Sequence, residues 1–259
     1  MHTVVPPVLQ GKKALVVGVA NDESIAYGCA KAFRAAGADI ALTYVNERAR
    51  AFVAPLAEAL EADVFAPLDV EKKPQLEAVF DEIRERWGRL DILVHSVAFA
   101  PKEDLQGGLL NCSAEGFAKA MDISCHSFIR MARLASPLMT EGGTMFAMTY
   151  LGANYVVPNY NVMGPVKAAL EASCRYLAYE LGPAGIRVHA ISPGPLKTRA
   201  AGGLKDFDAM LNEAAKKAPV GELADIMDVG HACAYLATPF ARHVTGGTVY
   251  VDGGAHIVV

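Results

Sequence analysis

Short apolar runs alternate along the chain with longer stretches in which apolar positions recur at helical spacing. The runs are rich in valine, isoleucine and leucine, which is typical of strands buried on both faces of a parallel sheet. We predict strands at residues 13–19, 39–44, 63–70, 91–97, 143–149, 186–191 and 248–251. We predict helices at residues 24–36, 47–60, 73–87, 114–138, 161–181 and 225–237. The alternation predicts repeated βαβ units.

These units predict an α/β fold, a doubly wound sheet of the Rossmann type with about seven parallel strands flanked by helices. No linker, low-complexity tract or repeat divides the 259 residues, so we expect a single domain spanning residues 1–259. Residues 193–217 have no strand pattern, and we expect an irregular, mobile segment there. In such a fold, ligands bind at the carboxyl ends of the strands.

Composition and charge argue against several classes of function. The chain has 24 Lys and Arg against 28 Asp and Glu, a net charge of -4, which is too little positive charge to attract nucleic acid. No stretch reaches about 18 apolar residues and no signal-peptide pattern opens the chain, so we expect a cytoplasmic protein that does not bind a membrane. The five cysteines are odd in number and scattered, which argues against a disulfide framework and against a metal site.

The turn after the first predicted strand is a candidate cofactor site. Gly18 follows the strand, and Ser24, Ile25 and Gly28 lead into the first helix. Glycine lets a backbone approach a pyrophosphate, and free N–H groups at a helix start attract its charge. The spacing is not the plain G-x-G-x-x-G, so an ordinary strand-to-helix turn is the alternative. The position in the first βα unit favours a dinucleotide.

The ends of the second and third strands bear on which cofactor is used. Val45 and Asn46 offer no cation at the end of the second strand, which favours NADH over NADPH, although Arg48 or Arg50 could fold back toward a 2′-phosphate. Asp69 follows the third strand. Its carboxylate could accept a hydrogen bond from the adenine amino group or, equally, cap the following helix.

Tyr160 and Lys167 are the candidate catalytic pair. They lie seven residues apart, which at about 100° per residue returns to nearly the same face of a helix. An ammonium beside a phenol stabilises the deprotonated phenol or polarises its hydrogen bonds, so the pair suits proton donation to a carbonyl or enolate oxygen. The alternative is an aromatic core contact beside a solvated lysine.

Taken together, the motifs resemble the short-chain dehydrogenase/reductase superfamily and, within it, the bacterial type I enoyl-acyl-carrier-protein reductases, which use NADH. The matching motifs are Gly18-x5-Ser24-Ile25-Ala26-x-Gly28, Leu68-Asp69-Val70, residues 94–101 (VHSVAFAP), Tyr150-x9-Tyr160-x6-Lys167, residues 158–164 (PNYNVMG), residues 194–198 (GPLKT) and residues 251–254 (VDGG). The six residues between Tyr160 and Lys167 separate this class from ordinary members of the superfamily, which have three.

The resemblance implies reduction of the trans-2 double bond of a fatty acyl chain on acyl carrier protein, by hydride transfer from NADH. It implies that Tyr160 hydrogen-bonds the thioester oxygen, that Lys167 holds the nicotinamide ribose, and that Tyr150 is a second active-site tyrosine. It implies cofactor contacts at Gly18, Ser24, Ile25, Asp69, Val70, Ser96, Val97, Ala98, Lys167, Gly194, Pro195, Leu196 and Thr198. It implies substrate contacts at Ala100, Tyr150, Tyr160, Met163, Ala200 and Phe207.

The resemblance also implies a substrate loop near residues 195–217, a homotetramer, and binding of triclosan-type inhibitors. Lys197, Arg199 and Lys205 are candidates for steering the acidic carrier protein toward the site. Ala98 stands where many members have glycine, and we expect its added methyl group to weaken triclosan binding.

Two other functions stay open. Pro193 stands where many members have alanine, and the motif Ser192-Pro193-Gly194 is closer to the sequences of the wider superfamily. This favours an NAD(P)-dependent carbonyl or alcohol oxidoreductase as the alternative enzyme, whereas Tyr150 and the spacing from Tyr160 to Lys167 count against it. The other is a catalytically silent nucleotide sensor, which would be expected to lack one or more of the candidate catalytic residues, and none of them is missing.

Overall fold

The computed structural model describes residues 7–196, 198 and 207–258, with the backbone alone for 207–210. One sheet contains the strands β1 (Lys13–Val17), β2 (Asp39–Tyr44), β3 (Val64–Pro67), β4 (Ile92–His95), β5 (Gly143–Met148), β6 (Ile186–Pro193) and β7 (Thr248–Val251). The strands lie in the order β3-β2-β1-β4-β5-β6-β7, and all neighbouring pairs are parallel. The prediction of a doubly wound Rossmann-type sheet is therefore confirmed.

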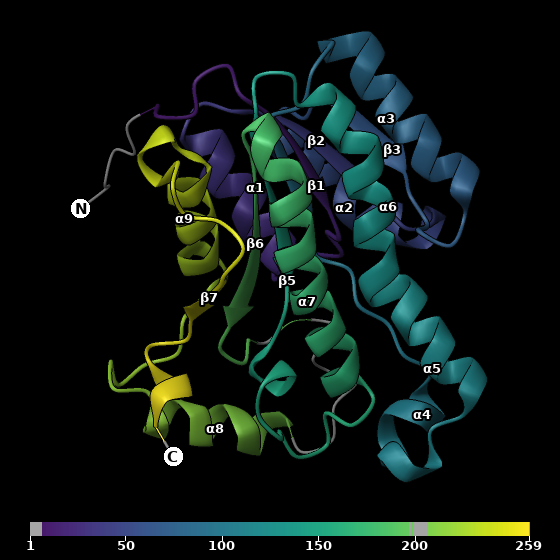
Figure 1. Cartoon of the computed structure of the whole chain (residues 1–259), viewed down its shortest axis with the longest axis vertical. Helices are drawn as coiled ribbons and strands as arrows, with labels where there is room; N and C mark the ends of the chain where they lie inside the picture. The colour runs from purple at the N-terminus through teal and green to yellow at the C-terminus, as the bar shows by residue number, and fades with distance from the viewer. Residues whose placement is uncertain (1–6, 197, 199–206, 259) are drawn as a thin grey trace.

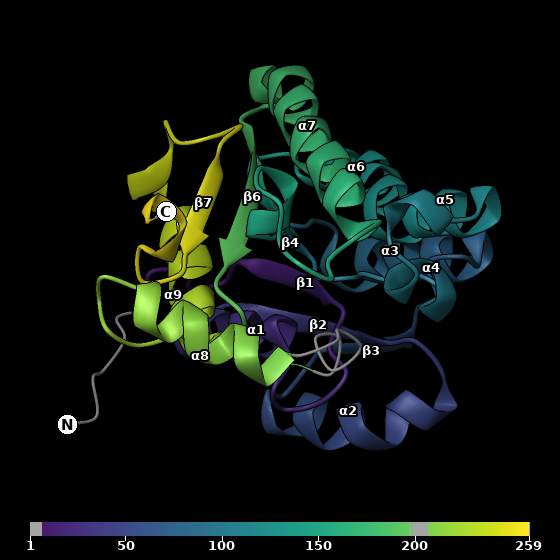
Figure 2. The ribbon, with the colours of Figure 1, turned by 90° about the horizontal axis from the view of Figure 1, so that it is seen from below.

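Helices cover both faces of the sheet (Figures 1 and 2). One face carries α1 (Ile25–Ala35), α2 (Glu47–Ala59) and α9 (Ile226–Ala237), and the other carries α3 (Lys73–Trp87), α6 (Ser127–Ala135) and α7 (Met163–Leu181). Each face has its own hydrophobic cluster, with Phe33 and Val229 in one and Phe80, Phe128 and Leu170 in the other. Burial on both faces explains why the strands read as continuous apolar runs.

The remaining helices lie toward the carboxyl ends of the strands, at the bottom of Figure 1. These are α4 (Lys102–Gln106), α5 (Ala114–Met121) and α8 (Phe207–Lys217). Short 3-10 turns complete the described chain at Leu109–Asn111, Ser136–Leu138, Leu151–Ala153, Gly182–Ala184, Pro239–Ala241 and Ala255–Ile257. The elements that surround a ligand in this fold are therefore gathered at one edge of the sheet.

Two predicted segments differ from the structure. The single helix predicted at residues 114–138 is divided into α5 and α6 by a π-helical turn, Asp122–His126. The extra residue rotates the apolar face by about 100° between the two helices, but each helix keeps its own 3.6-residue periodicity, so the pattern still predicts helix on both sides. The segment expected to be irregular, 193–217, ends in helix α8, whose sequence FDAMLNEAAKK is rich in good helix formers.

Gly28 has a packing role rather than the cofactor role that its motif suggests. It lies inside α1, where it is buried, and a Cβ built on it would come within 2.1 Å of the Ile226 backbone oxygen. A Cβ on Gly230 of α9 would come within 2.3 Å of the Gly28 oxygen. The two glycines therefore let the backbones of α1 and α9 touch, which holds the start of α1 against α9.

Candidate active site

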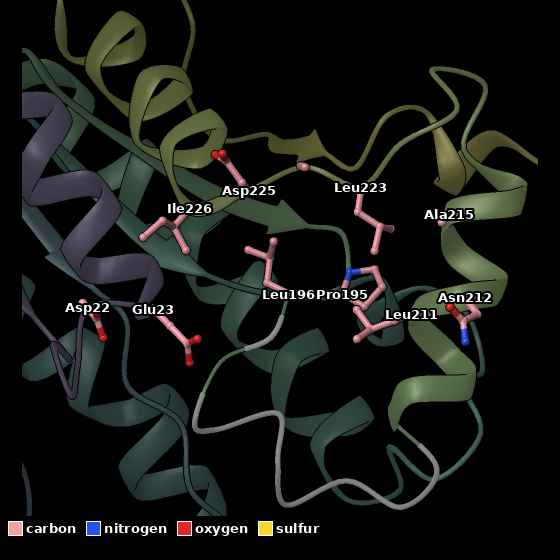
Figure 3. A pocket seen from close by; sticks show the side chains of 11 residues that line it. Asp22, Glu23, Pro195, Leu196, Leu211, Asn212, Ala215, Leu223, Asp225 and Ile226 are labelled. Atoms are coloured by element: carbon pink, nitrogen blue, oxygen red, sulfur yellow. The ribbon is translucent and has the colours of Figure 1, made fainter.

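A pocket of about 680 Å³ lies at the carboxyl edge of the sheet (Figure 3). Four segments line it: the turn after β1, the segment after β6, helix α8, and the residues that lead into α9. Its lining residues are Asp22, Glu23, Pro195, Leu196, Leu211, Asn212, Ala215, Leu223, Ala224, Asp225 and Ile226. The volume falls in the range of pockets that hold small ligands and cofactors. Pro195 and Leu196, both predicted cofactor contacts, thus share a pocket with the first βα turn.

The turn between β1 and α1 is built to leave backbone donors free for an anion. The Ser24 hydroxyl stays within the turn, because it accepts from the N–H groups of Ala20 and Asn21, each at 3.0 Å, and donates to the Asn21 side chain. Helix α1 begins at Ile25 with no acidic residue in its first turn and no side-chain cap. Its first N–H groups can therefore bind a pyrophosphate.

Gly18 fixes where this turn lies. Its φ is 111°, and a Cβ at this position would come within 2.1 Å of the Ser96 backbone oxygen. Only glycine lets the turn approach the end of β4 this closely. The predicted contacts Gly18 and Ser96, which are 78 residues apart in sequence, are therefore in direct backbone contact.

The side chains of Asn46 and Arg50, which follow β2, contact neighbouring residues of the same segment. Asn46 accepts a hydrogen bond from the Ala49 N–H at 2.9 Å and so caps α2. The Arg50 guanidinium lies over the Tyr44 ring, 6.0 Å from its centroid, and pairs with Glu47 at 3.9 Å. Arg50 is thus directed to its own neighbours, which is consistent with the predicted preference for NADH.

Asp69 and Val70 follow β3 and are held by contacts that the sequence did not indicate. Asp69 is not the N-cap of α3, which is Lys72, so that alternative is wrong. The Asp69 carboxylate instead accepts from the Glu71 N–H at 3.1 Å. Arg130 of α6 donates to the Val70 carbonyl at 3.0 Å and also pairs with Asp122. Arg130 therefore ties this strand end to α6.

The loop after β4 carries Ser96, Val97, Ala98 and Ala100, and it is held by a serine in the π-helical turn. The buried Ser124 hydroxyl accepts from the Phe99 N–H at 2.9 Å and donates to the Phe99 carbonyl at 3.0 Å. One side chain thus satisfies both backbone groups of the residue between Ala98 and Ala100. π-Helical turns occur often at functional sites, and this one places Ser124 against the loop.

Tyr160 does not lie on the helix that carries Lys167, so the helix-face argument for the pair is wrong. Helix α7 begins at Met163, and Tyr160 lies in a turn between two left-handed residues, Asn159 (φ 65°) and Asn161 (φ 45°). Asparagine tolerates this conformation better than most residues. The Asn161 side chain also donates to the Leu105 carbonyl at 2.6 Å, which ties the turn to α4.

The two predicted active-site tyrosines are brought together. The rings of Tyr150 and Tyr160 meet edge to face, with centroids 5.0 Å apart. Gly152 packs so closely that a Cβ there would lie 2.4 Å from the Tyr160 ring. Burial raises the pKa of Tyr150 to about 12, and burial, Tyr150 and Glu171 raise the pKa of Tyr160 still further. Tyr160 is therefore a neutral hydroxyl donor, and its pKa moves opposite to the expected lowering by an ammonium.

Lys167 is buried on α7, and its ammonium donates to the Met148 carbonyl at 2.7 Å. Met148 ends β5, two residues before Tyr150. Burial lowers the pKa of Lys167 to about 8, while Cys125, Cys174 and Glu171 oppose that effect. The alternative of a solvated lysine is therefore wrong. Met163, another predicted contact, is buried at the first turn of α7.

Sequence reasoning missed Glu171, which lies one helical turn after Lys167. It is 4% exposed and accepts hydrogen bonds from the Thr149 hydroxyl at 2.8 Å and the Asn154 amide at 2.9 Å. Buried carboxylates are rare unless they are paired or hydrogen-bonded. The only signal available in the sequence is an acidic residue on the apolar face of α7.

The segment after β6 is described only in part. Gly194 donates its N–H to the Val251 carbonyl at 2.9 Å, and Thr198 donates its N–H to the Leu196 carbonyl at 2.7 Å. The predicted contact Ala200 and the candidate steering residues Lys197, Arg199 and Lys205 lie outside the described residues. Phe207 is the first residue of α8, and its side chain is not among those described.

The described residues contain neither a cluster that could hold a metal ion nor a helix that could span a membrane. No group of three or more His, Cys, Asp or Glu side chains in this part of the chain is placed to hold a metal ion. Within the same residues, no helix has both the length and the apolar character needed to cross a membrane.

A family model described as enoyl-(acyl carrier protein) reductase matches residues 18–256. Among curated proteins, the chain is 47% identical over 249 residues to the protein named enoyl-[acyl-carrier-protein] reductase [NADH] 2 of Rhizobium meliloti, covering 96% of this chain and 93% of that protein. The match therefore extends over nearly the full length of both.

Solved structures are similar in fold as well as in sequence. The enoyl-(acyl-carrier-protein) reductase of Anaplasma phagocytophilum, in complex with NAD, has a TM-score of 0.93 and 46% identity, covering 97% of this chain and 96% of that one. The enoyl-acyl carrier protein reductase of Bacillus cereus, with NADP+ and indole naphthyridinone, has a TM-score of 0.95 and 43% identity, covering 97% and 99%.

Proposed function

The chain belongs to the enoyl-(acyl carrier protein) reductase family, and we propose that Tyr160, Tyr150 and Lys167 carry the family's reaction at the edge of the sheet described above. The reaction is the NADH-dependent reduction of an enoyl group on acyl carrier protein in fatty acid synthesis. The observation that carries the residue assignment is the edge-to-face pair of the partly buried Tyr150 and the buried Tyr160. Tyr150 lies two residues after Met148, whose carbonyl accepts a hydrogen bond from Lys167.

The residues present fit NADH. The free N–H groups at the first turn of α1 suit the pyrophosphate, and Gly18 lets the turn lie close to Ser96. Pro195 and Leu196 line the adjoining pocket. Lys167, with a pKa of about 8, is mainly protonated at neutral pH and would hold the nicotinamide ribose. NADH supplies the hydride that adds to the β-carbon of the enoyl thioester.

Tyr160 acts on the thioester oxygen, where negative charge develops as the β-carbon is reduced. Its raised pKa keeps the phenol protonated, so it donates a hydrogen bond that strengthens as the enolate forms. Tyr150 packs against the edge of this ring and, with Gly152, restricts its orientation. The Tyr160 phenol is buried, which increases the electrostatic value of the hydrogen bond that it donates.

Steady-state NADH oxidation tests this assignment. With trans-2-enoyl thioesters on carrier protein or coenzyme A, we expect wild-type turnover and a loss of about 100-fold or more in Tyr160→Phe. Tyr155→Phe is the matched control, because Tyr155 is exposed on the same loop, and we expect it to retain activity. Turnover of a 3-ketoacyl thioester alone would instead assign the carbonyl reductase activity, and full activity in Tyr160→Phe would overturn the role of the phenol.

We further propose a homotetramer. Family resemblance supports assembly through the long middle helices, and α7 exposes Tyr176 and Tyr179 while α5 and α6 expose Phe117 and Ile129. Large apolar side chains exposed on neighbouring helices are typical of subunit interfaces. Size-exclusion chromatography with light scattering gives the mass directly, and a monomer at micromolar concentration would contradict the proposal.

Compartment and partners complete the proposal. The five cysteines are free thiols, as expected for a reducing compartment, and we place the protein in the cytoplasm. Its macromolecular partner is the acyl carrier protein bearing the enoyl thioester, and the pocket beside the cofactor is open to triclosan-type inhibitors. A pull-down with acylated carrier protein tests the first of these interactions, and a triclosan inhibition curve tests the second.

A further inference from the structure

A buried carboxylate joins the parts of the site that carry the tyrosines and the lysine. At the end of β5, the Thr149 hydroxyl donates a hydrogen bond to the Glu171 carboxylate at 2.8 Å. In the loop after β5, the Asn154 amide donates to the same carboxylate at 2.9 Å. Tyr150 lies between these two partners in the chain. Asn154 in turn lies 3.4 Å from the Tyr250 hydroxyl of β7. One carboxylate therefore holds both ends of the segment that bears Tyr150.

We propose that Glu171 is a positioning residue of the reductase, which holds the Tyr150 segment against α7 and, through its negative charge, keeps Lys167 in its cationic form. This inference rests on the proposed roles of Lys167 and Tyr150. Glu171 itself need not touch substrate or cofactor. Its two carboxylate oxygens are occupied by Thr149 and Asn154, so its position is defined from both sides.

The charge balance around Lys167 makes this carboxylate significant. The ammonium is 4% exposed, and the groups that act on it are His95 from β4, Cys125 from the π-helical turn, and Glu171 and Cys174 from α7. Burial lowers the pKa of His95 to about 3, so it carries no charge at neutral pH. The thiols are neutral as well, because burial raises the pKa values of both.

With both thiols neutral, the Glu171 carboxylate is the remaining group among those that raise the pKa of Lys167. The same charge acts on the phenols, since it adds to the effect of burial in raising the pKa values of Tyr160 and Tyr250. A single carboxylate therefore favours a cationic Lys167 and a neutral Tyr160, the two protonation states that the proposed reaction requires. Removing the charge shifts both groups in the wrong direction for that reaction.

The test compares Glu171→Gln with wild type and with Glu180→Gln, an exposed glutamate on the same helix. Glutamine has nearly the shape of glutamate and can still hydrogen-bond Thr149 and Asn154 by rotating their side chains. NADH affinity is measured by cofactor fluorescence between pH 6.5 and 10. We expect the wild-type affinity to weaken with a midpoint near the Lys167 pKa of about 8. In Glu171→Gln the midpoint should fall by about one pH unit, and Glu180→Gln should superimpose on wild type.

A second variant tests the positioning role without a buried substitution. Asn154 is exposed, so Asn154→Ala removes its hydrogen bond to Glu171 and leaves the charge in place. We expect about a fivefold rise in KM for the enoyl thioester, the cost of one lost hydrogen bond, with the NADH midpoint unchanged. If Glu171 had only a structural role, both variants would be less stable than wild type. The pH midpoint of NADH binding would then not shift in Glu171→Gln, and the KM for enoyl thioester would not rise specifically in Asn154→Ala.

The outcomes separate this inference from the proposed function. An unchanged NADH midpoint in folded Glu171→Gln overturns the electrostatic role, and an unchanged KM in Asn154→Ala overturns the positioning role. The second measurement is decisive even if Glu171→Gln does not fold. A wild-type protein that binds NADH but does not reduce enoyl thioesters would refute the proposed function, while the midpoint comparison would still test the link between Glu171 and Lys167.

Discussion

Substitution of Gly28 by alanine probes how the fold positions the cofactor turn. The new Cβ would lie 2.1 Å from the Ile226 oxygen and 2.6 Å from its carbonyl carbon, both of them backbone atoms. Non-bonded heavy atoms settle at about 3.5 Å, so the start of α9 must separate from α1 by about 1 Å or more. Neither helix has a flexible side chain at this point that could move aside instead.

The expected cost follows from that displacement. Overpacking a tightly packed interior costs about 1–3 kcal/mol, and the upper end applies because backbone atoms must move. Alanine recovers about 1 kcal/mol of helix propensity, which leaves a net loss of roughly 2 kcal/mol. For a chain of this size, that corresponds to a fall of about 4–8 °C in melting temperature. NADH binding should weaken as well, because the first turn of α1 moves with the helix.

Circular dichroism melting at matched protomer concentration measures the effect. Gly182→Ala is the control, since Gly182 has helical φ and ψ of -55° and -42° and no atom within 4 Å of a built Cβ. We expect the control to change stability little, because Pro183 disfavours a helical residue with a Cβ before it and so offsets the gain from replacing glycine. A Gly28→Ala protein that melts within about 2 °C of wild type and binds NADH normally would refute the claim that α1 and α9 are in backbone contact there.

Three further predictions follow from the site and the core. Ser124→Ala removes both hydrogen bonds to Phe99, so steady-state kinetics should show a KM for enoyl thioester that is raised severalfold. An unchanged KM would mean that the loop after β4 keeps its position without these two hydrogen bonds. Ala98→Gly should bind triclosan more tightly in inhibition curves, and identical curves would remove the steric argument. Burial lowers the pKa of His95 to about 3 and that of His189 to about 4. Because the unfolded chain takes up these protons below about pH 6.5 while the folded chain does not, unfolding free energy should fall by up to about 1.4 kcal/mol per pH unit for each histidine as pH drops from 6.5 toward 4. Urea unfolding at pH 7 and 5 measures this fall, and a His189→Phe protein with the same pH dependence as wild type would exclude His189 as a source.

Much of the fold follows from the sequence because strands and helices have local periodicities. The sequence predicts the seven strands at their positions and α1, α2, α3, α7 and α9 to within a few residues. It joins α5 and α6 into one helix and does not predict α4 or α8. The apolar runs of β1, β4 and β5 could be recognised because both of their faces are buried. The sequence does not predict the π-helical turn at Asp122–His126, because the helices on either side each keep a helical pattern of apolar positions and differ only in its phase, by about 100°.

The sequence by itself determined the order of the elements, and the spacing of Tyr150, Tyr160 and Lys167 made them the candidate catalytic residues. Only the tertiary structure decided how these groups are arranged. Tyr160 lies in a left-handed turn before α7, its pKa is raised rather than lowered, and Glu171 joins its surroundings to those of Lys167. The physical reason is that periodicity is a property of neighbouring residues, whereas burial, charge and hydrogen bonding at this site arise where β4, β5, α7 and β7 meet, and no local pattern encodes that meeting.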